Sequence, residues 1–196
     1  TIGSWVSYGL GTENQSLPAY VVMDDPLGLP VNGVQCWQSG YLPPVYQGTR
    51  FRAEGSPVLN LRPERDVIEN VNAIKRDLLG KLDRIHKNKR PGQLQLDARI
   101  SSYELAARMQ LTVPEVANLK SEPTHVRKLY GADSNDKSKA AFAENCILAR
   151  RLIEQGVRFV QLFNGAYASG GRINWDGHFK LKEQYNIHGH ILDQPV

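Results

Sequence analysis

Cysteine is scarce in this sequence, with only Cys36 and Cys146 among 196 residues. Two thiols so far apart form neither a disulfide framework nor a zinc knuckle. Cys146 shares one helical side with Phe142 and Ala149, so we expect it to be a small core residue. A bond between Cys36 and Cys146 stays open as an alternative, because neither has another cysteine to pair with.

Long apolar runs and a one-sided charge are also lacking. No run approaches the ~20 residues that a transmembrane helix needs. The net charge of +4 comes from lysines and arginines on segments that also carry acids, so a nucleic-acid partner is not expected. A composition of 41% apolar and 22% charged residues is typical of a soluble globular domain.

The segment that organises the prediction is an apolar run near the end of the chain, made of Val157, Phe159, Val160, Leu162 and Phe163. Such a run predicts an interior strand that is buried on both faces. The glycine-rich residues 165–171 then predict a loop over the carboxyl edge of the sheet, where open α/β sheets bind ligands.

The rest of the chain alternates helical and extended patterns. We expect a helical turn in 4–11, a strand in 17–23, an αα-hairpin against the sheet from helices in 66–87 and 96–110, a short helix in 123–131, and a long helix capped from 133–136 that ends at Gly156. Residues 26–62 lack periodicity and predict an excursion packed by its own aromatics, or else a substrate-facing loop. The predicted fold class is α/β, with a central, mostly parallel sheet flanked by helices.

Two metal-ligand types stand two positions apart at the end of this loop, Asp176 and His178. On an extended segment their side chains share one side and suit zinc, manganese or iron. The alternative is that Asp176 only caps a helix spanning 179–192, with Trp175 preceding the cap. His188, further along that helix, would add a ligand or a supporting contact.

Several segments together resemble the DUF1501 family of bacterial proteins, which is abundant in planctomycetes: residues 4–14, 17–22, 39–51, 102–109, 146–161 and 175–178. That family is similar to sulfatases and to the alkaline-phosphatase-like superfamily. The resemblance implies a metal-dependent hydrolase domain of which 1–196 is an internal part, truncated at both ends. It places the Trp-Asp-x-His motif on Trp175, Asp176 and His178.

The resemblance also implies an exported protein, periplasmic or at the cell surface, that acts on small-molecule or polysaccharide sulfate or phosphate esters. The cofactor would be a divalent metal: zinc, manganese, calcium or iron. Trp175 and His188 would contact the substrate or support the metal ligands, and the catalytic nucleophile would lie outside this sequence. Lys180 and Tyr185 stand where family members often carry asparagine and histidine, so the alternative is a non-catalytic binding or cell-surface protein that keeps the fold.

Overall fold

The computed structural model describes residues 1–61, 69–165 and 175–196. The predicted glycine loop after Gly165, residue 62 of the excursion and the expected helix start at 66–68 lie outside these ranges. The elements run in the order α1 (Ile2–Leu10), β1 (Tyr20–Met23), η1 (Gly33–Trp37), η2 (Pro44–Tyr46), β2 (Thr49–Arg50), α2 (Glu69–Asn88), α3 (Leu94–Val116), η3 (Leu119–Ser121), α4 (Thr124–Tyr130), α5 (Lys137–Glu154), β3 (Phe159–Leu162) and α6 (Leu181–Asp193).

The three described strands form one parallel sheet in the order β2-β1-β3. Val21 of β1 aligns with Thr49 on one side and Val160 on the other. All four residues of β1 are buried, whereas those of β3 are half-buried. The α/β prediction is confirmed, but within the described ranges β3 is an edge strand and β1 the interior one. Parallel pairing joins distant segments, so an apolar run does not reveal its place in the sheet.

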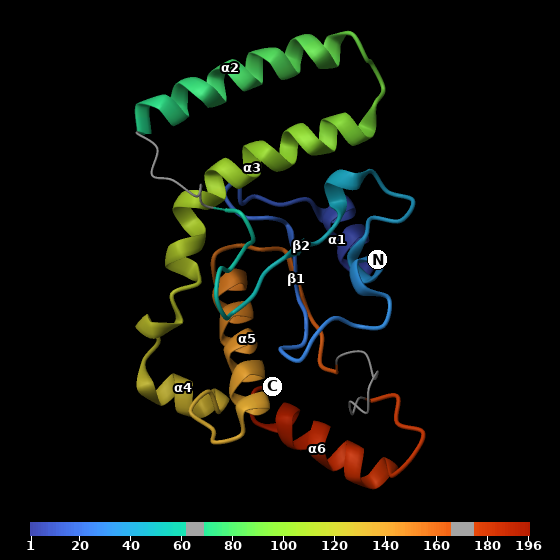
Figure 1. Cartoon of the computed structure of the whole chain (residues 1–196), viewed down its shortest axis with the longest axis vertical. Helices are drawn as coiled ribbons and strands as arrows, with labels where there is room; N and C mark the ends of the chain where they lie inside the picture. The colour runs from blue at the N-terminus through green and yellow to red at the C-terminus, as the bar shows by residue number, and fades with distance from the viewer. Residues whose placement is uncertain (62–68, 166–174) are drawn as a thin grey trace.

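Side chains of β1 alternate between two apolar layers, as the pleat of a strand requires. Val21 and Met23 join the main core with Ile147 and Leu148 of α5. Tyr20 and Val22 pack with Trp37 on the opposite side. Helix α1 lies so close there that a Cβ on Gly3 would come within 2.5 Å of the Tyr20 ring. The sheet is thus covered by α5 and by α1 with the excursion (Figure 1).

Helix α5 begins and ends as its sequence predicts. The Asp136 carboxylate accepts hydrogen bonds from the backbone N–H groups of Ser138 and Lys139. Gly156, just past the last turn, has a φ of 86°, which favours glycine. Cys146 is buried on this helix and burial raises its pKa to about 11, which confirms it as a core residue. Both cysteines are free thiols.

The α2 and α3 helices form the expected hairpin, with two corrections. Helix α3 runs through Pro114 to Val116, because burial of Val113 and Val116 offsets the hydrogen bond that proline cannot donate. Helix α2 does not lie against the sheet but beyond α3, at one end of the molecule (Figure 1). Its apolar side chains, expected to face the core, are exposed.

The excursion from Pro26 to Leu61 is neither regular nor empty of structure. It holds the short helices η1 and η2 and the two-residue strand β2, which is too short for any periodicity to predict. Trp37 and Phe51 are buried, while Tyr41 is fully exposed. Packing by its own aromatics is therefore confirmed for part of the segment.

Candidate functional site

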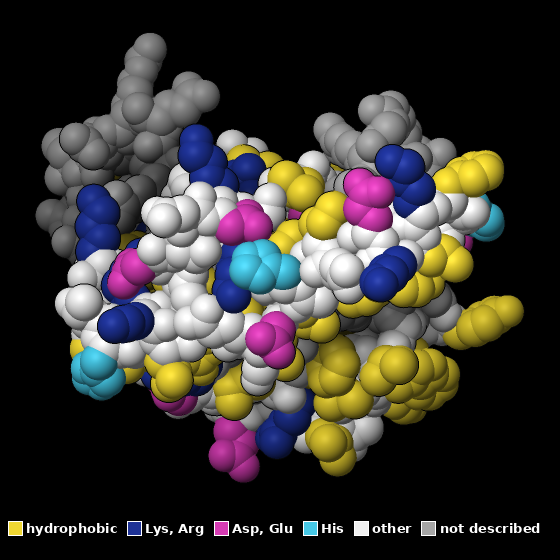
Figure 2. Space-filling model, turned by 90° about the horizontal axis from the view of Figure 1, so that it is seen from below, with side chains coloured by type: hydrophobic (Ala, Val, Ile, Leu, Met, Phe, Trp, Pro, Cys, Tyr) yellow, Lys and Arg dark blue, Asp and Glu magenta, His cyan; other side chains and the backbone are white. Residues whose placement is uncertain are grey.

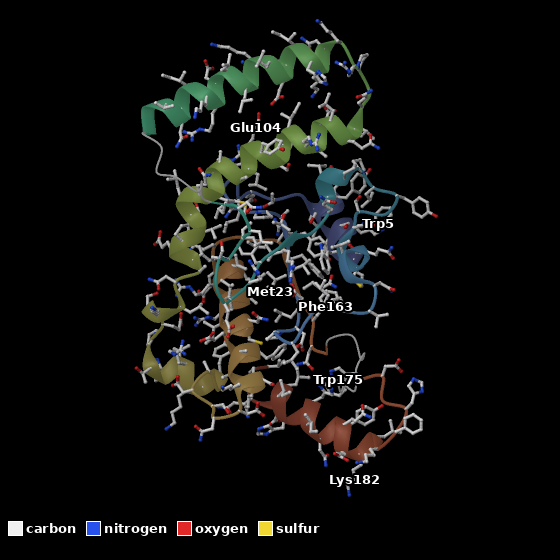
Figure 3. All side chains as sticks on the ribbon, viewed as in Figure 1. Trp5, Met23, Glu104, Phe163, Trp175 and Lys182 are labelled. Carbon is white, nitrogen blue, oxygen red and sulfur yellow. The ribbon has the colours of Figure 1, made fainter. Side chains whose placement is uncertain are left out.

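The carboxyl ends of the three parallel strands meet at one edge of the sheet. Asp24 and Asp25 follow β1, Asn164 follows β3, and Arg50 ends β2. Figure 3 shows Trp175 below Met23 and Phe163, between these strand ends and α6. The predicted motif thus starts at the edge where the sequence placed it.

Asp25 joins the loop after β1 to the loop after β3. Its side chain is buried, and the two carboxylate oxygens accept hydrogen bonds from the backbone N–H groups of Leu27 at 2.7 Å and of Gly165 at 2.6 Å. A carboxylate that accepts backbone N–H groups makes stronger hydrogen bonds than a neutral acceptor. Asp25 therefore fixes the backbone from which the chain departs toward the motif.

Asp24 is occupied by a two-point contact with Arg50. The guanidinium Nη2 donates to Oδ2 at 2.6 Å, and Nε donates to Oδ1. The hydrogen bond to Asp24 raises the pKa of Arg50. The Nδ2 group of Asn145, from α5, donates to the backbone oxygen of Asp24 at 3.1 Å. These contacts tie β1, β2 and α5 together and leave Asp24 little freedom to bind anything else.

Trp175 anchors the motif between the sheet and α6. Its indole Nε1 donates to Oδ1 of Asn164 at 2.7 Å. Its ring stacks on His188, with centroids 5.0 Å apart, and on Tyr185, with centroids 5.9 Å apart. Trp175 is only 40% exposed as a result.

Asp176 and His178 lie side by side. The distance from His178 Nε2 to Asp176 Oδ1 is 3.1 Å, and both side chains are about three-quarters exposed. Residues 175–180 are not helical, and α6 begins at Leu181 after Lys180, whose φ is 51°. The alternative in which Asp176 caps a helix starting at residue 179 is therefore wrong, because the left-handed backbone at Lys180 separates Asp176 from the helix.

The spacing of this pair is that of an ordinary ion pair or hydrogen bond between the two side chains, and it is also compatible with a shared cation. Zinc lies about 2.1 Å from each nitrogen or oxygen ligand, so two ligands are about 3.0 Å apart at a right angle and about 3.4 Å apart at the tetrahedral angle. The observed 3.1 Å falls between these limits. In the part of the chain that the structure describes, no three metal-ligating side chains come together. Further ligands would have to come from elsewhere.

His188 touches the motif only through the Trp175 ring among the contacts of the described residues. It is 3% exposed, and neither ring nitrogen has a hydrogen-bond partner among the described residues. The Nδ2 group of Asn164 is also buried without a partner. The predicted role of His188 in binding substrate or supporting the ligands thus stays a prediction, and its present contact is with Trp175.

The sequence reasoning missed Asp24, Asp25, Asn145 and Asn164. The signal was available for the first two, since a pair of acids directly follows the buried strand β1. It was not available for Asn145, which lies in the middle of α5.

A separate cavity of about 600 Å³ lies at the opposite, amino end of β1. Pro18 and Ala19 line it on one side, and Arg99, Tyr103 and Arg108 of α3 on the other. It shares no lining residue with the Trp175 motif.

Comparison with known families matches the whole chain, residues 1–196, to a family described as "Protein of unknown function (DUF1501)". The chain belongs to the DUF1501 family. No curated protein and no solved structure is significantly similar to this DUF1501 chain. None of its described helices has both the length and the hydropathy of a membrane span.

Proposed function

We propose that this DUF1501 chain belongs to an exported, metal-dependent hydrolase of the sulfatase and alkaline-phosphatase type. The observation that carries the proposal is the Asp176 and His178 pair, 3.1 Å apart outside any helix and connected through Trp175 to the carboxyl edge of the sheet. An oxygen and a nitrogen ligand at this spacing favour zinc, manganese or iron, with calcium as a further candidate.

Each residue of the motif has a distinct part in this proposal. Asp176 and His178 would hold the cation, and Trp175 would shape the pocket above α6. Bound there, a divalent ion would polarise a sulfuryl or phosphoryl oxygen or acidify a bound water. Asp25 keeps the neighbouring backbone in place through its two N–H contacts. The nucleophile and the remaining ligands would come from outside the described residues.

The substrate class and the location of the protein follow from the family resemblance. A sulfate or phosphate ester of a small molecule or polysaccharide, in the periplasm or at the cell surface, suits an enzyme of this type. The exposure of both ligands supports access by a large substrate, since nothing among the described residues covers them.

The test is metal content and ester turnover in the natural protein. We expect bound zinc, manganese, calcium or iron, together with hydrolysis of aryl sulfate or aryl phosphate. Asp176→Ala and His178→Ala should each lower metal content and turnover at least about 10-fold. His125→Ala, which removes an exposed histidine from α4, is the matched control and should change neither. Unchanged metal content and turnover in both motif variants would show that the site assignment is wrong.

A second candidate is a non-catalytic binding or cell-surface protein. It is favoured by the apolar side chains that the excursion exposes: Leu27, Leu29, Val31, Val34, Tyr41 and Val45. Figure 2 shows hydrophobic side chains gathered on one side of the molecule as seen from below. Large exposed apolar patches mark interaction sites. This function would be favoured if the metal-loaded protein hydrolysed neither ester and if Tyr41→Ser lost binding to the partner of this apolar surface.

A further inference from the structure

Helix α2 carries a stripe of aliphatic side chains that meets solvent. The stripe consists of Val71, Ile74, Leu78, Leu82 and Ile85, which are between 38% and 68% exposed. Its members recur every three or four residues and fall within about 80° of the helix circumference. A single helix with this much exposed aliphatic surface marks an interaction site.

The opposite side of α2 is the one turned toward α3. The partly shielded residues of α2 are Asn72, Gly80 and Asp83, which lie across the helix from the stripe. Lys87, on that same side, forms an ion pair with Asp97 of α3 at 2.8 Å. Among the described residues, this ion pair is the side-chain contact recorded between the two helices, and the stripe points away from α3.

The shape of the stripe favours another helix as its partner over a lipid surface. The five-residue stripe is as narrow as the seam of a coiled coil, although Leu79 is also exposed beside it, and α2 contains no Trp, Phe or Tyr. Helices that lie in a membrane interface present a broader apolar face, commonly with aromatic residues.

We propose that α2 pairs with α2 of a second copy of this chain, antiparallel, about a two-fold axis at Leu78. The aliphatic residues of the stripe are spaced symmetrically about Leu78. Ile74 and Leu82 lie four positions from it, and Val71 and Ile85 lie seven positions from it. Isologous pairing needs such self-complementarity, because each residue on one side of the axis meets its counterpart from the other side. Ile74 then packs beside Leu82 of the second copy.

The charges beside the stripe complement this arrangement. Asp77 and Lys81 lie on one flank, and their side chains form an ion pair at 2.6 Å. In an antiparallel pair, this flank of one helix lies next to the same flank of the other helix, which runs in the opposite direction. Asp77 of one chain therefore comes beside Lys81 of the other. Two helices about 30 Å long bury a small area, so the dimer is weak, with a Kd on the order of micromolar.

The test is disulfide trapping in a chain that carries Cys36→Ser and Cys146→Ala. Leu78→Cys should form a covalent dimer on mild oxidation, because the two thiols meet at the axis. Ile74→Cys should give at least about 10-fold less covalent dimer. In the antiparallel pair the two copies of residue 74 lie about 12 Å apart along the helices, beyond the reach of a disulfide. Ile74→Cys mixed with Leu82→Cys should cross-link again. Equal trapping at positions 74 and 78 would overturn the antiparallel register.

Light scattering on the unmodified chain gives an independent measurement. At about 100 µM the apparent mass should approach twice that of one chain. Leu78→Glu should weaken the dimer at least about 100-fold, because both copies lose a buried leucine and two carboxylates meet at the axis. Ala73→Glu adds the same charge away from the stripe and should leave the dimer intact. Circular dichroism of both variants verifies that α2 is folded.

Three results would contradict the proposal. A monomer at all concentrations, or a dimer that Leu78→Glu leaves unchanged, would show that the stripe does not join two copies. Sedimentation of a monomeric chain with phosphatidylglycerol vesicles would assign the stripe to a membrane surface. Each result leaves the proposed metal site unaffected, because α2 contributes nothing to it.

Discussion

Two acid-bearing segments at the same edge of the sheet have opposite surroundings. Asp24 and Asp25, after β1, are nearly or fully buried and accept hydrogen bonds from Arg50 and from two backbone N–H groups. Asp176, in the motif after β3, is about three-quarters exposed beside His178. The comparison suggests that the first pair holds the edge together, and that the second is exposed enough to meet a ligand.

The largest effect should come from Asp25→Ala. We expect a loss of about 3 kcal/mol in the free energy of unfolding, because two backbone N–H groups lose their acceptor in a buried setting. Urea denaturation followed by circular dichroism measures it. Asp193→Ala, at the exposed end of α6, is the control and should change stability by less than about 0.5 kcal/mol. Equal losses of stability in Asp25→Ala and Asp193→Ala would show that Asp25 is no more structural than an exposed acid.

Arg50→Ala should cost somewhat less, about 2 kcal/mol. The change leaves the Asp24 carboxylate, which is 9% exposed, without its cation, but Arg50 itself is 35% exposed and water can partly replace it. Arg52→Ala serves as the control, since among the described residues its guanidinium hydrogen-bonds only to the exposed Ser56 carbonyl. A thermal melt in which Arg52→Ala loses more stability than Arg50→Ala would contradict the role given to Asp24.

A third carboxylate, Glu122, shows how a fixed acid should respond to pH. Burial alone would raise its pKa, but hydrogen bonds and charges from Arg150 and Arg151 outweigh burial and lower it from 4.5. Its contribution to stability is therefore full above the unfolded-state pKa and is lost as the pH falls through the folded-state pKa. We expect wild-type stability to decline below about pH 5, and to decline more than that of Glu122→Gln.

Denaturation midpoints measured between pH 7 and about pH 3 test this contribution. Glu154→Gln is the matched control, because Glu154 faces the same Arg150 at 3.7 Å but is 58% exposed. That variant should keep the wild-type pH dependence. An identical decline in Glu122→Gln and the wild type would mean that Glu122 contributes nothing measurable.

The smallest effect on stability should come from the motif itself. Asp176→Ala and His178→Ala should each change the free energy of unfolding by less than about 0.5 kcal/mol without added metal, because an exposed pair adds little. With saturating zinc the wild type should gain stability that neither variant gains. Destabilisation above 2 kcal/mol without metal would instead make the pair structural.

The elements that sequence predicted well are those whose signals are local. Asp136 caps α5 through backbone groups two and three residues away, and the apolar run of β3 is nearly continuous, interrupted by Gln161. The position of a strand within the sheet has no such local signal. β3 became an edge strand, within the described ranges, because its partner β1 lies far away along the chain and no residue of the run specifies it.

The candidate site likewise has features that local sequence predicts and features that it does not. The proximity of Asp176 to His178 followed from their spacing on an extended segment. The place of Asp25 at a strand end could have been predicted, but its contact with Gly165 could not, because the two residues are 140 positions apart. The outward direction of the α2 stripe was also hidden, since periodicity shows that a face is apolar but not what covers it.

The distance between β1 and β3 along the chain has a consequence for how the protein is made. The Tyr20 hydroxyl contacts Gln161, 141 positions later, so the central strand gains one neighbour only after most of the chain has been synthesised. At about 5 to 20 residues per second, a ribosome needs roughly 7 to 28 seconds to cover that distance. During this time one edge of the apolar strand β1 is unpaired, and we expect the yield of the protein in cells to depend on chaperones that shield β1.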